Sequence, residues 1–293
     1  MTTNLSPGVR YMLASTFYFS LMNVCIKAVG HLPAMELVFF RCGVSALICL
    51  YLLRRDKISW KGTNRRLLLL RGIFGTIALL AYILTLKHLS LGTAVTLQYL
   101  SPIFTTIIAI FILKERVKLY QWLFFALSFA GTFVIKGVDA NVNSFYLTIG
   151  ILSAFFSGLA YNMVRSLREK EHPMVVVLHF QLIGAISGMV FSVPAWVMPV
   201  AYDWLFLLLT GIFTQLGQTA MTKSLQHEAV ANVTILNYIG VIYAMVFGYL
   251  FFNDKYPVET IAGILMVIGG VVLSVIFRHS KRILRFTMAD KNT

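Results

Sequence analysis

Residues 65–88 read RRLLLLRGIFGTIALLAYILTLKH, and residues 204–227 read WLFLLLTGIFTQLGQTAMTKSLQH. The triplet Gly-Ile-Phe at 72–74 recurs at 211–213, an offset of 139 residues, and the same offset pairs His88 with His227. Further identical pairs at this offset are Asn23/Asn162, Ala81/Ala220, Leu86/Leu225, Leu97/Leu236, Tyr99/Tyr238, Ile103/Ile242 and Gly131/Gly270. Matches of Asn, His, Tyr and Gly in one register are hard to attribute to an apolar composition, so the sequence predicts an internal duplication.

The composition of the chain places both copies in a membrane. Of its 293 residues, 58% are hydrophobic and 12% are charged, and the mean hydropathy is +0.80. Soluble domains hold roughly 45–50% apolar and about 25% charged residues, so a soluble globular fold is excluded. The apolar residues form blocks of about 20, the length that a helix needs to cross a hydrocarbon core of roughly 30 Å. We therefore expect an all-α integral membrane protein with ten transmembrane helices, at residues 10–28, 34–53, 67–87, 93–113, 119–136, 145–165, 174–193, 204–223, 231–252 and 258–277.

The duplication divides these helices into two repeats. Residues 1–139 hold the first five helices, and residues 140–293 hold the second five and a short cytoplasmic tail. Because five is an odd number, the second half must be inverted relative to the first. Inverted repeats are typical of transporters, which bind substrate near the membrane midplane, where the repeats meet.

Basic residues orient the predicted bundle. Of the 25 Lys and Arg residues, 20 fall in segments that share one side when the N-terminus is cytoplasmic. The positive-inside bias therefore puts both termini in the cytoplasm, with the chain in the cytoplasmic (inner or plasma) membrane. The net charge of +14 sits mainly in loops between apolar spans, and no groove-sized basic helix of the kind that binds nucleic acid is formed. We expect the lipid bilayer, and no nucleic acid, as a partner.

Cysteine and histidine usage predicts no metal site and no cofactor. Cys25, Cys42 and Cys49 lie in the first two apolar blocks without a CxxC pair, and they are expected to be small buried packing residues. The six histidines are scattered, and neither an HExxH nor a GxSxG motif occurs. A membrane-embedded enzyme needs clustered nucleophiles, bases or metal ligands, so we expect that the chain is not an enzyme.

Several short motifs resemble one known family. They are Glu36-Leu37-Val38-Phe39-Phe40-Arg41, Arg71-Gly72, Leu86-Lys87-His88-Leu89, Pro102, Lys114-Glu115-Arg116, Gln218-Thr219-Ala220-Met221, and Asp254 followed by Gly263. Together they resemble the EamA-type branch of the drug/metabolite transporter superfamily, over essentially all of residues 10–277, and the S-adenosylmethionine-uptake-like carriers in particular. The resemblance implies a ten-helix carrier of two inverted repeats that moves small metabolites by alternating access. The second half departs from the pattern, with Val241 where the first half has Pro102.

Charged residues inside the spans are rare. Arg41 lies about seven residues into its helix, where a guanidinium is costly unless it faces a wet cavity or a partner. It is a candidate anchor for a substrate carboxylate or phosphate, and the alternatives are a structural ion pair or an extended side chain that reaches the interface. Arg71 is expected to reach the cytoplasmic interface in this way. His179 is the one group placed to couple protons, against the alternative of a packing role, because Asp and Glu occur only near helix ends.

Neutral polar residues inside the spans are the remaining candidates for a substrate cavity. They are Asn23, Gln98, Tyr99, Asn162, Gln181, Gln215, Gln218, Asn237, Tyr238 and Tyr243. If the halves are inverted, Gln98-Tyr99 and Asn237-Tyr238 form two matching rims, one for each gate. The alternative for each Asn or Gln is a hydrogen bond to a neighbouring helix, worth about 0.6 kcal/mol. Pro102 is expected to kink the helix at 93–113 and act as a hinge beside the pathway.

These observations favour a secondary transporter of a small polar metabolite, zwitterionic or anionic, across the cytoplasmic membrane. An exporter of hydrophobic or aromatic compounds is the alternative, and a membrane-embedded enzyme is a more distant one. The residues are equally compatible with uptake and export. Ala126 and Ala130, small residues four apart on an outer helix, are a candidate homodimer contact, although the same spacing also serves packing within one chain.

Overall fold

The computed structural model describes residues 6–112, 119–138, 143–167, 170–227 and 239–289. Within these ranges the chain is α-helical, with one short 3-10 helix and no strand. The helices are α1 (Pro7–Ala28), α2 (Ala34–Arg55), α3 (Arg65–His88), α4 (Leu91–Gln98), α5 (Ser101–Ile112), α6 (Leu119–Val138), α7 (Ser144–Leu167), α8 (Pro173–Ser192), η1 (Val193–Ala195), α9 (Asp203–His227), α11 (Ile239–Phe252) and α12 (Val258–Ala289). Most bounds agree with the expected spans to within a few residues.

Local sequence explains where several helices begin. The side chains of Ser6, Asn64 and Ser90 each accept a hydrogen bond from the backbone N–H three residues on, and so cap α1, α3 and α4. Pro7 and Pro173 occupy first-turn positions of α1 and α8, where the missing N–H costs nothing.

Two expected elements are corrected. The single helix at 93–113 is two helices, α4 and α5, separated at Tyr99 and Leu100. Pro102 has no N–H to donate to the carbonyl of Gln98, so the α-helical ladder cannot continue through this point. The last helix does not end at residue 277 but continues as α12 to Ala289, because residues 278–289 contain neither Gly nor Pro to stop it.

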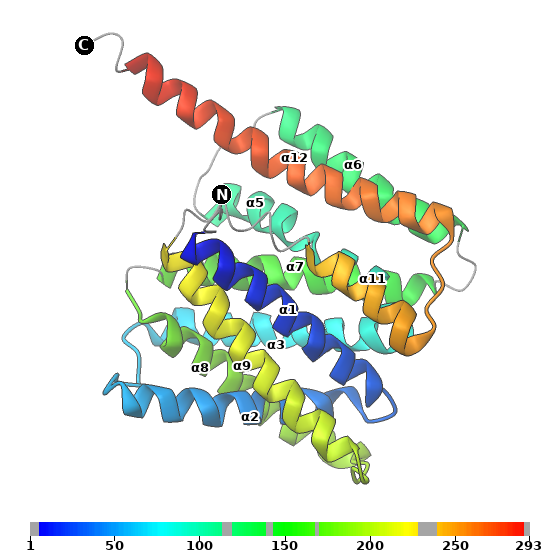
Figure 1. The fold of residues 1–293 in the computed structure, drawn as a ribbon. Coiled ribbons are helices and arrows are strands. Elements are labelled where there is room, and N and C mark those ends of the chain that lie inside the picture. Colours follow the sequence, from blue (N-terminus) through cyan, green and yellow to red (C-terminus); the bar gives the residue numbers. More distant parts are fainter. Residues whose placement is uncertain (1–5, 113–118, 139–142, 168–169, 228–238, 290–293) are drawn as a thin grey trace, which may run out of the picture.

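The helices pack in pairs that join the two halves of the chain. α1 lies along α9 and α3 along α7, while α2 packs on α8 and α6 on α12 (Figure 1). The start of α1 and the far end of α12 lie toward the same end of the bundle, and α12 projects beyond it. Each of these contacts therefore pairs a helix before residue 140 with one after it.

Glycines let two of these pairs approach closely. A Cβ on Gly188 of α8 would lie 2.5 Å from the backbone nitrogen of Phe39 on α2. A Cβ on Gly131 of α6 would lie 2.6 Å from the carbonyl oxygen of Gly263 on α12. Small residues at such crossings are the usual device for tight helix packing inside a membrane.

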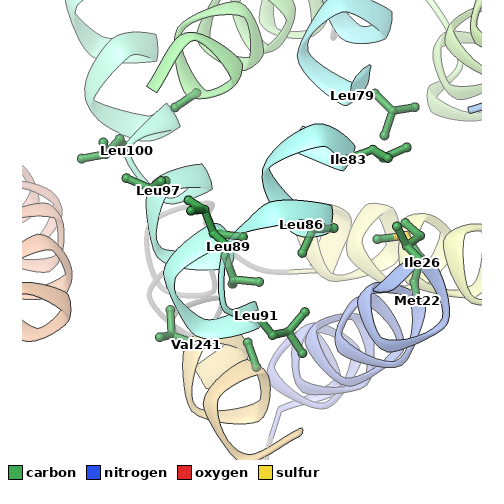
Figure 2. Close-up of a cluster of buried hydrophobic side chains, with 14 of the residues drawn as sticks. Met22, Ile26, Leu79, Ile83, Leu86, Leu89, Leu91, Leu97, Leu100 and Val241 are labelled. Atoms are coloured by element: carbon green, nitrogen blue, oxygen red, sulfur yellow. The ribbon is translucent and has the colours of Figure 1, made fainter. Parts of the chain in front are cut away.

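An apolar core fills the bundle where α1, α3, α4 and α11 meet. Figure 2 shows Met22 and Ile26 of α1, Ile83 and Leu86 of α3, and Val241 of α11 turned into this cluster. Cys25, Cys42 and Cys49 are buried and free of disulfides, as expected.

The outward faces of the helices carry many exposed large apolar side chains, as a surface in contact with lipid requires. Among the described residues, six helical spans are long and apolar enough to cross a membrane: Ala34–Arg55, Arg65–His88, Leu91–Phe111, Ser144–Leu167, Pro173–Ala195 and Asp203–Met221. Three shorter apolar helices are Trp122–Ile135, Ile239–Phe252 and Val258–Leu273. The chain is therefore an all-helical, multi-pass membrane protein.

Candidate functional site

A cavity of about 210 Å³ lies among α1, α2, α3, α4, α7, α8, α9 and α11. Its lining is rich in polar side chains: Thr16, Ser20, Asn23, Arg41, Arg71, Tyr82, Gln98, Tyr99, Ser157, Tyr161 and Gln218. Apolar wall is supplied by Phe19, Met22, Ala78, Leu79, Val95, Ala160, Phe180 and Met221. The described lining contains two arginines and neither Asp nor Glu, so the cavity is electropositive.

Arg41 lies in this cavity, buried to 6% exposure. Its Nε donates to the sulfur of Met22 over 3.4 Å, and Nη1 has no hydrogen-bond partner within the described part of the chain. Glu36 is not its ion-pair partner, because the Glu36 carboxylate accepts from the N–H of Val197 instead. The structure therefore leaves a guanidinium donor available inside the cavity.

The expectation that Arg71 reaches the membrane interface is wrong. Arg71 is 8% exposed and lines the same cavity as Arg41. Its guanidinium lies over the ring of Phe180, 4.3 Å from the ring centroid, a cation–π contact that replaces part of the lost hydration. The face of α3 that carries Arg71, Gly75, Ala78, Leu79 and Tyr82 points inward because these residues recur at helical spacing.

Gln98 is held by α7. Its Nε2 donates to Ser157 Oγ over 2.8 Å, and its Oε1 accepts from Ser153 Oγ over 2.9 Å. Tyr99, at the break that follows α4, lines the cavity beside it. Asn23 on α1 shares a hydrogen bond with Tyr82, and its Oδ1 is unpartnered among the described residues.

Of the other candidate residues, Gln218 lines the cavity, whereas Asn162, Gln181 and Gln215 do not contribute to its lining. Asn162 donates to the carbonyls of Thr105 and Gly158. Gln181 donates to Ser45 Oγ over 2.9 Å, and Ser45 Oγ donates to Gln215 Oε1 over 2.8 Å. These amides join α7 to α5 and α8 to α2 and α9, the interhelical role that was the alternative for them.

His179, Tyr243 and Pro102 also lie outside the cavity lining. His179 Nδ1 is 2.9 Å from the carbonyl of Val175 in its own helix. Tyr243 packs its ring against Phe17 and Phe247. Pro102 lies in the first turn of α5, next to the break at Tyr99. Asn237 and Tyr238 fall outside the described residues.

Corresponding positions of the two halves meet in the cavity. At the offset of 139 residues, four pairs both line it: Met22/Tyr161, Arg41/Phe180, Leu79/Gln218 and Tyr82/Met221. In each pair one member is apolar and the other is polar or charged. The two halves therefore build the cavity from equivalent positions with different chemistry.

Sequence reasoning missed Arg71, Tyr82, Ser157 and Tyr161 as lining residues. The inward face of α3, with residues at 71, 75, 78, 79 and 82, could have indicated Arg71 and Tyr82. The apolar partners Met22 and Met221 give no sequence signal for Tyr161 and Tyr82, because only the fold shows that these positions meet. Within the described ranges, no group of three or more His, Cys, Asp or Glu could hold a metal ion.

Comparison with known proteins assigns the family. The family model of the EamA-like transporters matches residues 6–137 and again residues 144–276. The chain belongs to the EamA-like transporter family. The drug/metabolite transporter superfamily is thereby shown, and the EamA membership points away from enzyme activity.

Relatives of this EamA protein carry transport names. The pseudopaline exporter CntI of Pseudomonas aeruginosa is 30% identical over 274 residues, which cover 92% of this chain and 96% of that protein. Solute carrier family 35 member G1 of Homo sapiens is 27% identical over 286 residues, covering 90% of this chain and 78% of its own length. The S-adenosylmethionine uptake transporter of Rickettsia prowazekii is 22% identical and covers 94% of both chains.

One solved crystal structure shares the fold. It superposes with a TM-score of 0.67 at 16% sequence identity, over 94% of this chain and 98% of its own. Because exporters and an uptake transporter both occur among the relatives, family membership supports transport in general.

Proposed function

We propose that this EamA protein is a secondary transporter that moves a small zwitterionic or anionic metabolite across the cytoplasmic membrane by alternating access. The observation that carries the proposal is Arg41, buried in a cavity that both halves line, with Nη1 unpartnered among the described residues. A buried guanidinium is costly in a membrane unless a partner neutralises it, and a planar fork binds carboxylate or phosphate bidentately.

The proposed architecture is ten spans in two inverted five-helix repeats. The packing pattern supports it, because exchanging the halves maps the contact of α1 with α9 onto that of α7 with α3. The contacts of α2 with α8 and of α6 with α12 map onto themselves. A two-fold relation of this kind, with an odd number of spans in each half, places the axis in the membrane plane and the cavity on it.

The proposed orientation puts both termini in the cytoplasm, following the excess of Lys and Arg in the loops on that side. Tyr99 and the equivalent Tyr238 are then the gate positions on opposite sides of the cavity. Ala126 and Ala130 face outward from α6, away from α12, which keeps them available for a homodimer contact between two copies of this helix.

A second candidate function is export of hydrophobic or aromatic compounds. The aromatic walls of the cavity, Phe19, Tyr82, Tyr99, Tyr161 and Phe180, favour it. Arg41 distinguishes the two functions, because an apolar cargo gives the guanidinium no partner.

The test is a thermal-shift screen of the purified protein against amino acids, S-adenosylmethionine, riboflavin, nucleosides and carboxylates, followed by transport of each hit in proteoliposomes. A ligand at 100 times its Kd stabilises the folded state by about 2.7 kcal/mol. We expect Arg41→Ala to insert and fold but to lose both the shift and the transport of an anionic or zwitterionic hit.

The matched control is Arg55→Ala, which removes an exposed arginine of the same charge near the end of the same helix and should leave transport unchanged. Normal transport with normal affinity in Arg41→Ala would remove the anchor role. A selective response to neutral aromatic compounds that survives Arg41→Ala would establish the second candidate.

A further inference from the structure

Two arginines share one cavity without an acidic neighbour in its described lining. Arg41 comes from α2 and Arg71 from α3, and their side chains are 6% and 8% exposed. They are close enough to repel each other electrostatically. Two like charges buried together in a membrane protein are unfavourable unless negative charge is brought to both.

Neither arginine uses all of its donors. A guanidinium has five N–H groups. Within the described part of the chain, Arg41 Nη1 and Arg71 Nε are buried without a hydrogen-bond partner. Met22 sulfur and the Phe180 ring are the contacts printed by the geometry around them, and both are weak partners for a cation compared with a carboxylate or phosphate.

The repeat emphasises that the charge pair is an addition to one half. At the offset of 139 residues, Phe180 stands opposite Arg41 and Thr210 corresponds to Arg71. The second half therefore supplies a ring and a hydroxyl where the first half supplies two cations. A fold with this duplication needs neither arginine for its helix packing, since the equivalent positions are neutral.

The remaining walls describe the rest of the ligand. Phe19, Leu79, Phe180 and Met221 form apolar surface beside the two cations. A monoanion bound here leaves one guanidinium unpaired, whereas two negative charges on one molecule pair with both.

We propose that the cavity selects a small organic molecule that carries two negative charges and an apolar or aromatic body. This inference rests on the proposed function and names its substrate class. Two carboxylates or one phosphate monoester supply the same charge, and the experiment separates these two sources.

The experiment measures Kd by thermal shift on the purified full-length protein with three probes: phenylsuccinate, 3-phenylpropionate and phenyl phosphate. The first two differ by one carboxylate, and the third carries its charge on one phosphate. We expect at least one dianion to bind about tenfold or more tightly than 3-phenylpropionate, as one added charge-assisted contact allows. Phenylsuccinate in front indicates two carboxylates, and phenyl phosphate in front indicates one phosphate.

Three variants locate the preference. Arg71→Gln should bind the dianions and 3-phenylpropionate with similar Kd, while Arg71→Lys, which keeps the charge and guards against a folding defect, should retain part of the preference. Arg55→Gln, at an exposed site, should behave as the unmodified protein.

Equal binding of all three probes by the unmodified protein, or a full dianion preference in folded Arg71→Gln, overturns the inference. So does the absence of any response to both dianions in folded protein. A monocarboxylate preference that disappears in Arg41→Ala overturns the two-charge site and leaves the proposed function standing. Loss of transport for every anionic and zwitterionic hit is the separate failure of the proposed function.

Discussion

Gly75 lies one helical turn after Arg71 on α3, and it leaves the space that the Arg71 guanidinium occupies. A Cβ at Gly75 would overlap Arg71 Nη1 and would lie 2.8 Å from Cδ2 of Phe180. The absence of a side chain at Gly75 therefore permits the stacking of Arg71 on Phe180. Since a desolvated cation–π contact is worth about 2 kcal/mol, this one methyl position affects how the cavity presents its charge.

We predict that Gly75→Ala weakens binding of the transported anion by about tenfold or more, because the guanidinium must leave the Phe180 ring. The protein should still fold, with a loss of about 1–3 kcal/mol from overpacking. Thermal shift with and without ligand checks both parts. Gly43→Ala on α2 is the control, because a Cβ there meets nothing within 4 Å; an equal effect of both substitutions would contradict the prediction.

At the scale of elements, the connection from α2 to α3 is fastened to the segment between α7 and α8 by Glu171. The Glu171 carboxylate accepts from the Thr63 hydroxyl over 2.6 Å and from the N–H of Asn64 over 2.5 Å. The Thr63 hydroxyl also lies 3.3 Å from the carbonyl of Lys170. These contacts connect the end of α7 to the loop that caps α3, so both halves meet again outside the spans.

This fastening should depend on pH. Partial burial raises the pKa of Glu171, but hydrogen bonds from Thr63 and Asn64 outweigh it, so the pKa lies below its ordinary value. A lowered folded-state pKa stabilises the native form above the ordinary glutamate pKa of about 4.3, and the stabilisation is lost as the pH falls through the lower value.

We expect amide hydrogen exchange of residues 56–64 to be slow near neutral pH, after correction for intrinsic rates, and to lose protection below pH 4 or so. In Glu171→Gln the protection should be low and nearly independent of pH. The same protection in both proteins at neutral pH would show that the carboxylate does not hold this connection.

The whole molecule is tied at one end of the bundle by an ion pair between the halves. Lys27 at the end of α1 lies 2.8 Å from Asp254, in the connection between α11 and α12. Asp254 Oδ2 also accepts from the N–H of Leu91 at the start of α4, over 2.7 Å. The pair is largely buried, so this conformation is held closed where α1, α4 and α12 meet, and a transport cycle must break the tie.

We predict that Asp254→Asn opens the cavity toward this end. A cysteine at Ser157, in the cavity lining, should then react with a membrane-impermeant thiol reagent about tenfold faster from the side of the α1–α2 connection. That factor corresponds to about 1.4 kcal/mol of lost closure. Asp56→Asn breaks an exposed ion pair with Arg55 and should leave the rate unchanged; a similar increase in both variants would contradict the role of the tie.

The sequence by itself determined the class of protein, the positions of its helices and the duplication. Blocks of apolar residues and Pro, Ser and Asn at their ends act locally along the chain, so α1, α2, α3, α7 and α8 could be predicted to within a few residues. The break between α4 and α5 was only partly visible, because Pro102 indicated a kink and not two separate helices.

Which polar residues share the cavity was decided by tertiary structure. Arg41, Asn23, Gln98, Tyr99 and Gln218 were predicted for a cavity and line one. Gln181 and Gln215 look equivalent to them in sequence, yet both join helices through Ser45, and Arg71 entered the cavity against expectation. The physical reason is that a residue's place along its helix follows from sequence, whereas the direction it faces depends on how helices from both halves rotate and pack against each other.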